Sequence, residues 1–142
     1  MSVPSDTAVL RATMRFFEIE QRQLLAQHGS VSQSRLLVLL SRHGPLSQIE
    51  LVRITTLEKS WMSRAIDRLV EHGWVTKQPS ELDRRSVSVE LTRAGRKQAQ
   101  QIEDLLDKHA ESVLQRLPVG KRKSVIDALG MLQIVLEPPV KK

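Results

Sequence analysis

The sequence predicts a mainly α-helical fold with one small β-hairpin, arranged as a winged helix-turn-helix between longer flanking helices. Two observations in the middle of the chain predict this fold. Between Leu46 and Gly73, two short amphipathic segments are joined by a tight turn. Directly after them, two stretches with strand character enclose a turn-rich, basic loop. A helix pair followed by a hairpin is the element order of a winged helix-turn-helix.

Two helices are expected before this central segment. The first follows Ser5 or Asp6, either of which can cap a helix N-terminus, and it ends before Gly29, at about 6–28. The second is expected over about 32–42 and is apolar on almost every side. A helix with this pattern is buried, so we expect the second helix at the centre of the monomer.

The helix-turn-helix starts at Ser47. Ser47 can cap the first helix, and Glu50, three residues later, can reach back to it in a capping box. Thr55 and Thr56 interrupt this helix, because consecutive β-branched residues weaken helical structure.

The second helix of the pair is expected from about Glu58 to His72. Met62, Ile66 and Leu69 recur at helical spacing and predict a buried stripe. Gly73 stands where a C-terminal cap requires a left-handed residue. Polar and basic residues occupy the rest of the helix surface, as expected of a helix that enters a DNA groove. An ordinary solvated surface helix would show the same pattern when taken alone.

The hairpin follows at once. Residues 74–77 and 86–91 are expected to form its two strands, the second from its alternation of polar and apolar residues. Pro79 is expected to keep the intervening loop out of the sheet. Arg84 and Arg85 lie at the expected tip, where they can meet phosphates or a narrow minor groove, and Asp83 can pair with Arg85. A basic loop directly after a helix-turn-helix indicates DNA binding far more specifically than a charged loop alone.

Two helices are expected after the hairpin, over about 93–117 and 120–136. Thr92 can cap the longer one, and Pro118 and Gly120 separate the two. The last helix carries an apolar seam, whose residues are Val125, Leu129, Leu132 and Leu136. The seam could fold back on its own monomer. A shared interface with a second copy, formed by the first and last helices, is the interpretation we favour.

Composition narrows the function classes. The 142 residues are enough for one domain, and the net charge of +6 suits a polyanionic partner. The chain has no cysteine, which excludes disulfides and thiol-based sensing. It has neither a signal peptide nor an apolar run of the roughly 20 residues that a membrane span needs. We therefore expect a cytoplasmic prokaryotic protein without membrane attachment.

The central segment resembles the MarR (multiple antibiotic resistance regulator) family of transcription factors. The resemblance lies in the runs Ser60-x-Met62-Ser63-Arg64-x-x-Asp67-Arg68-Leu69, Gly73-Trp74-Val75, Asp83-Arg84-Arg85 and Leu91-Thr92-x-x-Gly95. With the flanking helices it covers nearly the whole chain, as one MarR-like domain with a winged segment at about 31–92 and dimerisation helices at about 6–28 and 93–137. The resemblance implies a homodimer on double-stranded DNA, an inverted-repeat operator and, in many members, a small-molecule effector. Repression is the family's commonest mode.

Three residues depart from the family pattern. Thr56 stands where a turn glycine is common, Glu58 replaces a serine at the start of the second helix, and Trp61 replaces a smaller residue. Glu58 suits the helix dipole but repels a nearby phosphate. Trp61 can either stack on the DNA or pack inside the protein. The departures affect the individual base contacts rather than the fold.

The predicted site residues fall into two groups. The DNA-binding candidates are Ser47, Gln48, Lys59, Ser60, Trp61, Ser63, Arg64, Arg68, Lys77, Asp83, Arg84 and Arg85. The candidates for holding an anionic aromatic effector, where the dimerisation helices meet the winged segment, are Arg11, Arg15, His28, Arg35 and Arg42. Taken singly, each of the second group is better explained as a surface charge or an intramolecular ion pair.

We expect no enzyme activity, no cofactor and no metal site. The sequence has no glycine-rich phosphate loop or nucleophile motif, and its four histidines lack short ligand spacing. Two alternatives remain open: a winged regulatory domain of an acetyltransferase-type enzyme, of which Trp61 is reminiscent, and a protein-interaction module that does not bind DNA.

Overall fold

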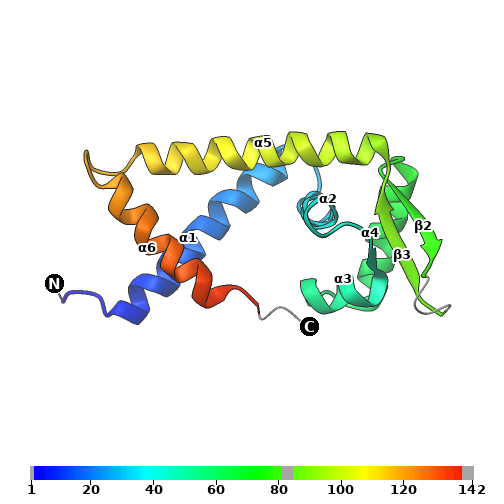
Figure 1. The fold of residues 1–142 in the computed structure, drawn as a ribbon, viewed down its shortest axis with the longest axis horizontal. Helices are drawn as coiled ribbons and strands as arrows, with labels where there is room; N and C mark the ends of the chain where they lie inside the picture. Colours follow the sequence, from blue (N-terminus) through cyan, green and yellow to red (C-terminus); the bar gives the residue numbers. More distant parts are fainter. Residues whose placement is uncertain (1, 81–84, 139–142) are drawn as a thin grey trace. The chain divides into compact units, whose positions relative to one another are not determined.

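The computed structural model describes residues 2–80 and 85–138, which form six helices and a small sheet (Figure 1). In chain order the elements are α1 (Asp6–Gln27), α2 (Val31–His43), β1 (Leu46–Ser47), α3 (Gln48–Thr55), α4 (Lys59–Glu71), β2 (Val75–Pro79), β3 (Val87–Leu91), α5 (Arg93–Gln115) and α6 (Arg122–Leu136). The chain divides into two compact units, Met1–Leu106 and Asp107–Lys142. The mainly helical winged fold is confirmed. The extent of a single domain stays a prediction.

Serine side chains start the first three helices of the first unit. The Ser5 hydroxyl accepts from the Ala8 amide at 3.2 Å, and the Ser30 hydroxyl accepts from the Gln33 amide at 3.3 Å. These bonds satisfy amides that have no partner within the helix. They fix where α1 and α2 begin.

The predicted capping box of α3 is present in full. The Glu50 amide donates to the Ser47 hydroxyl at 3.1 Å, and the Ser47 amide donates to the Glu50 carboxylate at 2.8 Å. Both side chains are therefore engaged in holding the start of α3, the first helix of the helix-turn-helix.

The sheet has three strands rather than the expected two. β1 pairs with β3 through Leu46↔Val89 and Ser47↔Ser88, which gives the antiparallel order β1-β3-β2. Sequence patterning missed β1 because two residues are too few to show alternation and their partner lies more than forty residues away. The third strand ties the start of α3 to the hairpin.

The expectation for Pro79 was wrong, because this residue ends β2 instead of lying in the loop. It pairs with Val87, and the Ser80 amide beyond it donates to the Ser86 carbonyl at 3.0 Å. β2 is an edge strand of the sheet, where proline is tolerated because its missing N–H faces no partner strand. The hairpin is therefore longer than expected.

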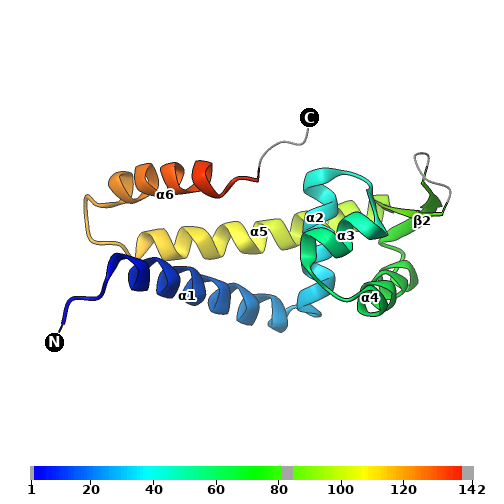
Figure 2. The ribbon, with the colours of Figure 1, turned by 90° about the horizontal axis from the view of Figure 1, so that it is seen from below.

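The core of the first unit lies between α2, α3, α4 and the inner face of the sheet (Figure 2). α2 contributes Leu36, Leu37, Val38 and Leu40, which confirms it as the buried central helix. The predicted stripe of α4 is equally buried, because Met62, Ile66 and Leu69 are at most 1% exposed. Burial of these side chains fixes which face of α4 points outward.

Two backbone features set the direction of the chain on either side of α4. Thr56, between α3 and α4, adopts the left-handed region at φ 58°, a conformation that favours glycine. Gly73 has φ 74° after α4, as its position predicts.

The wing is anchored at its base by Thr92. Its hydroxyl accepts from the Gly95 amide at 3.0 Å and donates to the Gly73 carbonyl at 2.6 Å, while its amide donates to the Trp74 carbonyl at 2.9 Å. One residue thus caps α5 and joins it to the segment that follows α4.

The second unit contains the C-terminal part of α5 and the whole of α6. α5 ends at Gln115, two residues earlier than expected, and α6 starts at Arg122. The Arg122 guanidinium donates two bonds to the Glu111 carboxylate, at 2.8 and 2.7 Å, and these bonds join the two helices. Throughout residues 2–80 and 85–138, the helices are too short or too polar to traverse a bilayer.

Candidate nucleic-acid interface

The outward face of α4 is polar and basic. Ser60 and Arg64 are exposed on the side opposite the buried stripe, and Arg68 lies one turn further along. In the part of the chain that the structure describes, neither arginine forms an ion pair with a carboxylate. Guanidinium groups in this state can donate bidentate bonds to a guanine edge or a phosphate.

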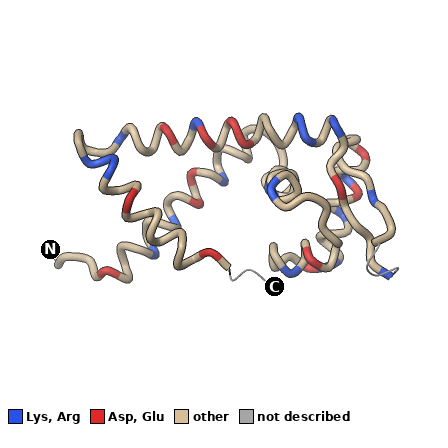
Figure 3. The backbone as a smooth tube through the Cα atoms, viewed as in Figure 1, with Lys and Arg blue, Asp and Glu red and all other residues tan. Residues whose placement is uncertain are grey.

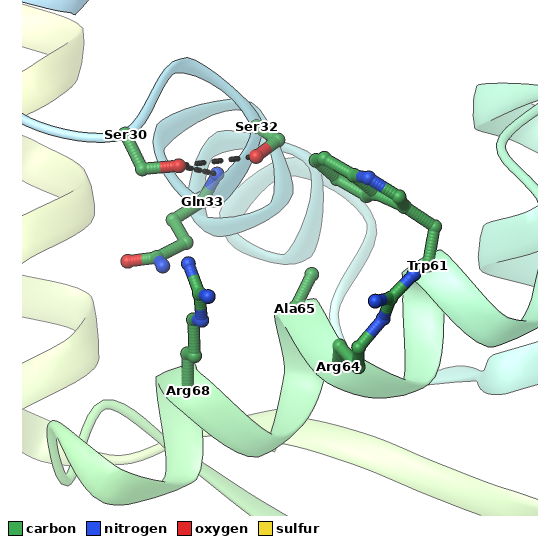
Figure 4. Close-up of a pocket in the computed structure, with 7 residues that line it drawn as sticks. All are labelled: Ser30, Ser32, Gln33, Trp61, Arg64, Ala65 and Arg68. Carbon is green, nitrogen blue, oxygen red and sulfur yellow. Dashed lines mark hydrogen bonds between the residues drawn. The ribbon is translucent and has the colours of Figure 1, made fainter.

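A hollow of about 160 Å³ separates this helix from the start of α2 (Figure 4). Trp61, Ala65, Arg64 and Arg68 of α4 line one side, and Ser30, Ser32 and Gln33 line the other. The Arg68 side chain points toward Gln33, and the Trp61 indole, 42% exposed, lies toward Ser32. Trp61 therefore lies at the edge of the outward face of α4, where it can either stack on DNA or pack inside the protein.

Lys59, Ser60 and Ser63 complete the predicted contacts on α4. Lys59 and Ser60 are exposed in its first turn, whereas Ser63 is half-buried. Glu58 precedes them as the N-cap residue and makes no side-chain cap bond. Its carboxylate thus adds negative charge at the end of α4 nearest the turn.

Ser47 and Gln48 do not line the hollow beside Arg64 and Arg68. Ser47 faces a second groove, over the outer face of the sheet, together with Gln78 and Ser88. Its hydroxyl is used in the capping box, and Gln48 is half-buried. Neither residue therefore shares the hollow that Arg64 and Arg68 line.

The wing contributes Lys77 and Arg85 among the described residues. The Lys77 ammonium lies 2.7 Å from the Asp67 carboxylate of α4, so its charge is engaged within the protein. Arg85 is exposed beside the wing loop. Asp83 and Arg84, the other predicted wing residues, lie outside the described residues.

The five effector candidates do not converge on one site. Arg35 and Arg42 line a cavity of about 250 Å³. Each is ion-paired, Arg35 with Glu18 and Arg42 with Glu103, the latter through bonds of 3.2 and 3.3 Å.

The remaining three candidates lie elsewhere. His28 caps α1, with its Nδ1 3.0 Å from the Leu24 carbonyl. Arg11 and Arg15 line a separate hollow on α1, and the Arg15 guanidinium lies 5.5 Å from the centre of the Phe16 ring. Arg35 and Arg42 thus share one cavity and Arg11 and Arg15 share another hollow, and His28 lines neither.

Charge is unevenly distributed along the chain (Figure 3). The net charge of +6 arises outside the segment 46–92, because this segment holds seven Lys or Arg and seven Asp or Glu. Whether the outward face of α4 carries a positive potential therefore depends on where each acidic residue of segment 46–92 lies and on its ion-pair partner. No group of three or more His, Asp or Glu suited to a metal ion occurs within residues 2–80 and 85–138.

Patterning of the central segment missed the residues at the start of α2. Ser30, Ser32 and Gln33 form the wall opposite Arg64 and Arg68. The signal was available, because a serine followed three residues later by glutamine is a helix-start signature. Their position beside α4 follows only from the packing of α2.

A family model for the MarR family matches residues 25–87. The HTH-type transcriptional regulator YfiV of Bacillus subtilis is 30% identical over 108 residues, which cover 76% of this chain and 68% of the relative. The regulator YpoP of the same organism is 30% identical over 89 residues, 63% of each chain. The chain thus spans about two thirds of the length of these relatives.

The solved apo structure of MarR from Escherichia coli has the same fold. It superposes with a TM-score of 0.80 at 20% sequence identity and covers 96% of this chain and 100% of that one. The winged arrangement seen here is therefore shared with a solved member of the family. Together with the matches in sequence, this shows that the chain belongs to the MarR family, whose members are DNA-binding transcriptional regulators rather than enzymes.

Proposed function

We propose that this protein is a sequence-specific repressor that binds an inverted-repeat operator as a homodimer and acts in the cytoplasm, where the chromosome lies. The outward face of α4 carries this proposal, because its arginines Arg64 and Arg68 are exposed and have no carboxylate partner among the described residues. In a DNA complex, α4 would enter the major groove with Ser60 and Arg64 toward the base edges. Arg68, Lys59 and Arg85 would face phosphates.

Exposed apolar residues on the terminal helices support the homodimer. On α1, Val9 is 50% and Phe16 is 62% exposed; on α6, Leu129 is 41% and Ile134 is 74% exposed. A stable soluble protein covers apolar surface of this kind. Two copies related by a twofold axis would read half-sites about 10–10.5 bp apart, or a multiple of that spacing.

Release by a small anionic, aromatic ligand is part of the same proposal. The cavity lined by Arg35 and Arg42 offers two guanidinium groups. Because Glu18 and Glu103 already pair with them, an anion must displace these carboxylates and thereby loosen contacts of α2 with α1 and α5. Benzoate is a suitable probe: at millimolar concentration it should weaken operator binding by the wild type and not by an Arg35→Ala, Arg42→Ala variant.

The experiment that tests DNA binding is a gel-shift titration against the duplex upstream of the protein's own coding region and an unrelated duplex of equal length. We expect preference for the upstream duplex. We also expect an affinity that falls by about 10³–10⁵ between 50 and 200 mM salt if roughly 6–10 phosphates are neutralised. Equal, salt-labile binding to both duplexes would refute autoregulation at this sequence and leave only attraction to phosphate.

A matched pair of variants locates the contact on α4. Arg64→Ala should cost roughly 1–3 kcal/mol of operator binding and reduce discrimination between the duplexes. Arg22→Ala removes an exposed arginine of α1 and should leave affinity within about twofold. If both variants bound like the wild type, α4 would not be the reading helix. The winged fold would then serve a protein partner instead.

A further inference from the structure

The ion pair between Lys77 and Asp67 joins the wing to the reading helix. The Lys77 ammonium lies 2.7 Å from a carboxylate oxygen of Asp67. Lys77 stands opposite Val89 in the sheet, and Val89 is fully buried. Directly opposed residues share one face of a sheet, so Lys77 projects from the inner face toward α4 rather than outward along the wing.

Asp67 occupies a sensitive position on α4. It lies three residues after Arg64 and next to Arg68, the two arginines proposed to meet DNA. Residues three apart on a helix are neighbours and form ion pairs when their charges are opposite. Without Lys77, the Asp67 carboxylate could therefore form an ion pair with Arg64, and it would also repel phosphate.

The charge balance of segment 46–92 makes the neutralisation of Asp67 by Lys77 important. Residues 46–92 carry as many acidic as basic side chains, so no excess of positive charge masks a single misplaced carboxylate. Glu50 is engaged in the capping box of α3. Asp67 is engaged by Lys77, which leaves Arg64 without a carboxylate partner among the described residues.

We infer that Lys77 is a positioning residue: by holding Asp67, it keeps Arg64 available to DNA, and it does not itself make an essential phosphate contact. This inference rests on the proposed DNA-binding function. Side chains of the pair are 43% and 53% exposed, and an exposed pair contributes little to stability. Variants of the two residues should therefore fold like the wild type.

The test measures the effect of Lys77→Met in two backgrounds. Methionine keeps the apolar stem of the lysine and removes its charge. In the wild-type background we expect operator affinity to fall by about tenfold, because Asp67 is released beside Arg64. In the Asp67→Asn background, where no carboxylate needs neutralising, Lys77→Met should change affinity by no more than about twofold and leave the salt slope unchanged.

A direct phosphate contact gives the opposite result. If Lys77 met a phosphate, Lys77→Met would weaken binding in both backgrounds and lower the slope of log affinity against log salt by about 0.9 in each. This pattern would overturn the positioning role. Lys123→Met is the matched control, because it removes one lysine from another exposed ion pair, with Asp127 of α6 at 2.9 Å, and should not alter operator affinity.

Two further readouts separate the causes of failure. The Nε–Hε resonance of Arg64 in the free protein should shift in Lys77→Met and return in the double variant, which a loss of stability would not produce. A wild-type protein that did not discriminate the upstream duplex would refute autoregulation at this sequence, which is a failure of the proposed function and not of the role of Lys77. A discriminating wild type with equal losses in both backgrounds would refute the role of Lys77 alone.

Discussion

Substituting Gly95 by alanine should destabilise the protein, although alanine normally stabilises a helix. Gly95 lies in the first turn of α5, and a Cβ atom built on it would lie 1.8 Å from the Trp74 carbonyl oxygen and 2.8 Å from its carbon. Real Cβ atoms essentially never approach closer than 3.0 Å, so the helix and this carbonyl must separate by more than an ångström. The obstacle is backbone, which cannot rotate away as a side chain would.

The cost follows from what that separation disturbs. The Trp74 carbonyl accepts from the Thr92 amide at 2.9 Å, and the Thr92 hydroxyl donates to the Gly73 carbonyl at 2.6 Å. Overpacking costs about 1–3 kcal/mol, and a weakened hydrogen bond costs about 1 kcal/mol. The gain in helix propensity returns about 1 kcal/mol. The net expectation is a loss of about 2 kcal/mol, or roughly 5–10 °C in melting temperature.

Thermal unfolding followed by circular dichroism measures this loss, and Gly130→Ala provides the control. Gly130 also lies within a helix, α6, but a Cβ atom there meets nothing within 4 Å. This variant should be more stable than the wild type by about 0.5–1 kcal/mol. A Gly95→Ala protein that melted at or above the wild-type temperature would refute the close-approach argument.

Three other perturbations have defined outcomes. Thr56→Gly should stabilise the protein by about 0.5–1 kcal/mol in urea titrations, because left-handed backbone costs a threonine about 1–2 kcal/mol and glycine loses part of that gain to unfolded-chain entropy. A loss of stability would mean that contacts of the threonine side chain contribute more than its left-handed backbone costs. The hydrogen bonds from Arg122 lower the pKa of Glu111 against the opposing effect of desolvation. The stability that these bonds add is therefore present above the ordinary carboxyl pKa and is lost as pH falls through the lowered pKa. Unfolding of Glu111→Gln should be less acid-dependent over that range than unfolding of the wild type. Leu129→Glu should convert a dimer to monomers in sedimentation velocity and abolish operator preference, whereas Asp127→Ala, on the opposite side of the same helix, should change neither.

Local signals in the sequence predicted most helix boundaries. Ser47 and Glu50 form the expected capping box, and Gly73 adopts the expected left-handed conformation, because both features depend only on residues close in sequence. The buried stripe of α4 followed equally from helical periodicity. Prediction succeeded wherever the determining interaction spans one or two helical turns.

Features that depend on tertiary contacts could not be predicted from the sequence. The expectation that Pro79 leaves the sheet assumed a hydrogen-bonded position, but the sheet order makes β2 an edge. The placement of Gly95 in a family motif was visible, whereas its reason, the approach of the Trp74 carbonyl, was not. Neither the strand order nor that approach leaves a periodic trace in the chain.

The division of the arginines into structural and available groups was likewise beyond sequence patterning. Arg35 pairs with Glu18, seventeen residues away, and Arg42 pairs with Glu103, sixty-one residues away. At these separations no spacing rule applies, so a cation that will be paired looks the same in the sequence as one that will not. Which of the effector candidates are ion-paired could therefore not be predicted from the sequence.

Net charge alone is thus a poor guide to the surface that meets DNA in this protein. The segment 46–92 is electrically balanced, yet Arg64 and Arg68 are left without carboxylate partners among the described residues. Two acids of this segment are engaged locally, Glu50 at the start of α3 and Asp67 by Lys77. Since a charge acts over about 8–10 Å at physiological salt, it is this local pairing that determines the potential at a DNA groove. Substitutions that preserve net charge but exchange partners should therefore change operator binding more than substitutions that alter net charge on α6.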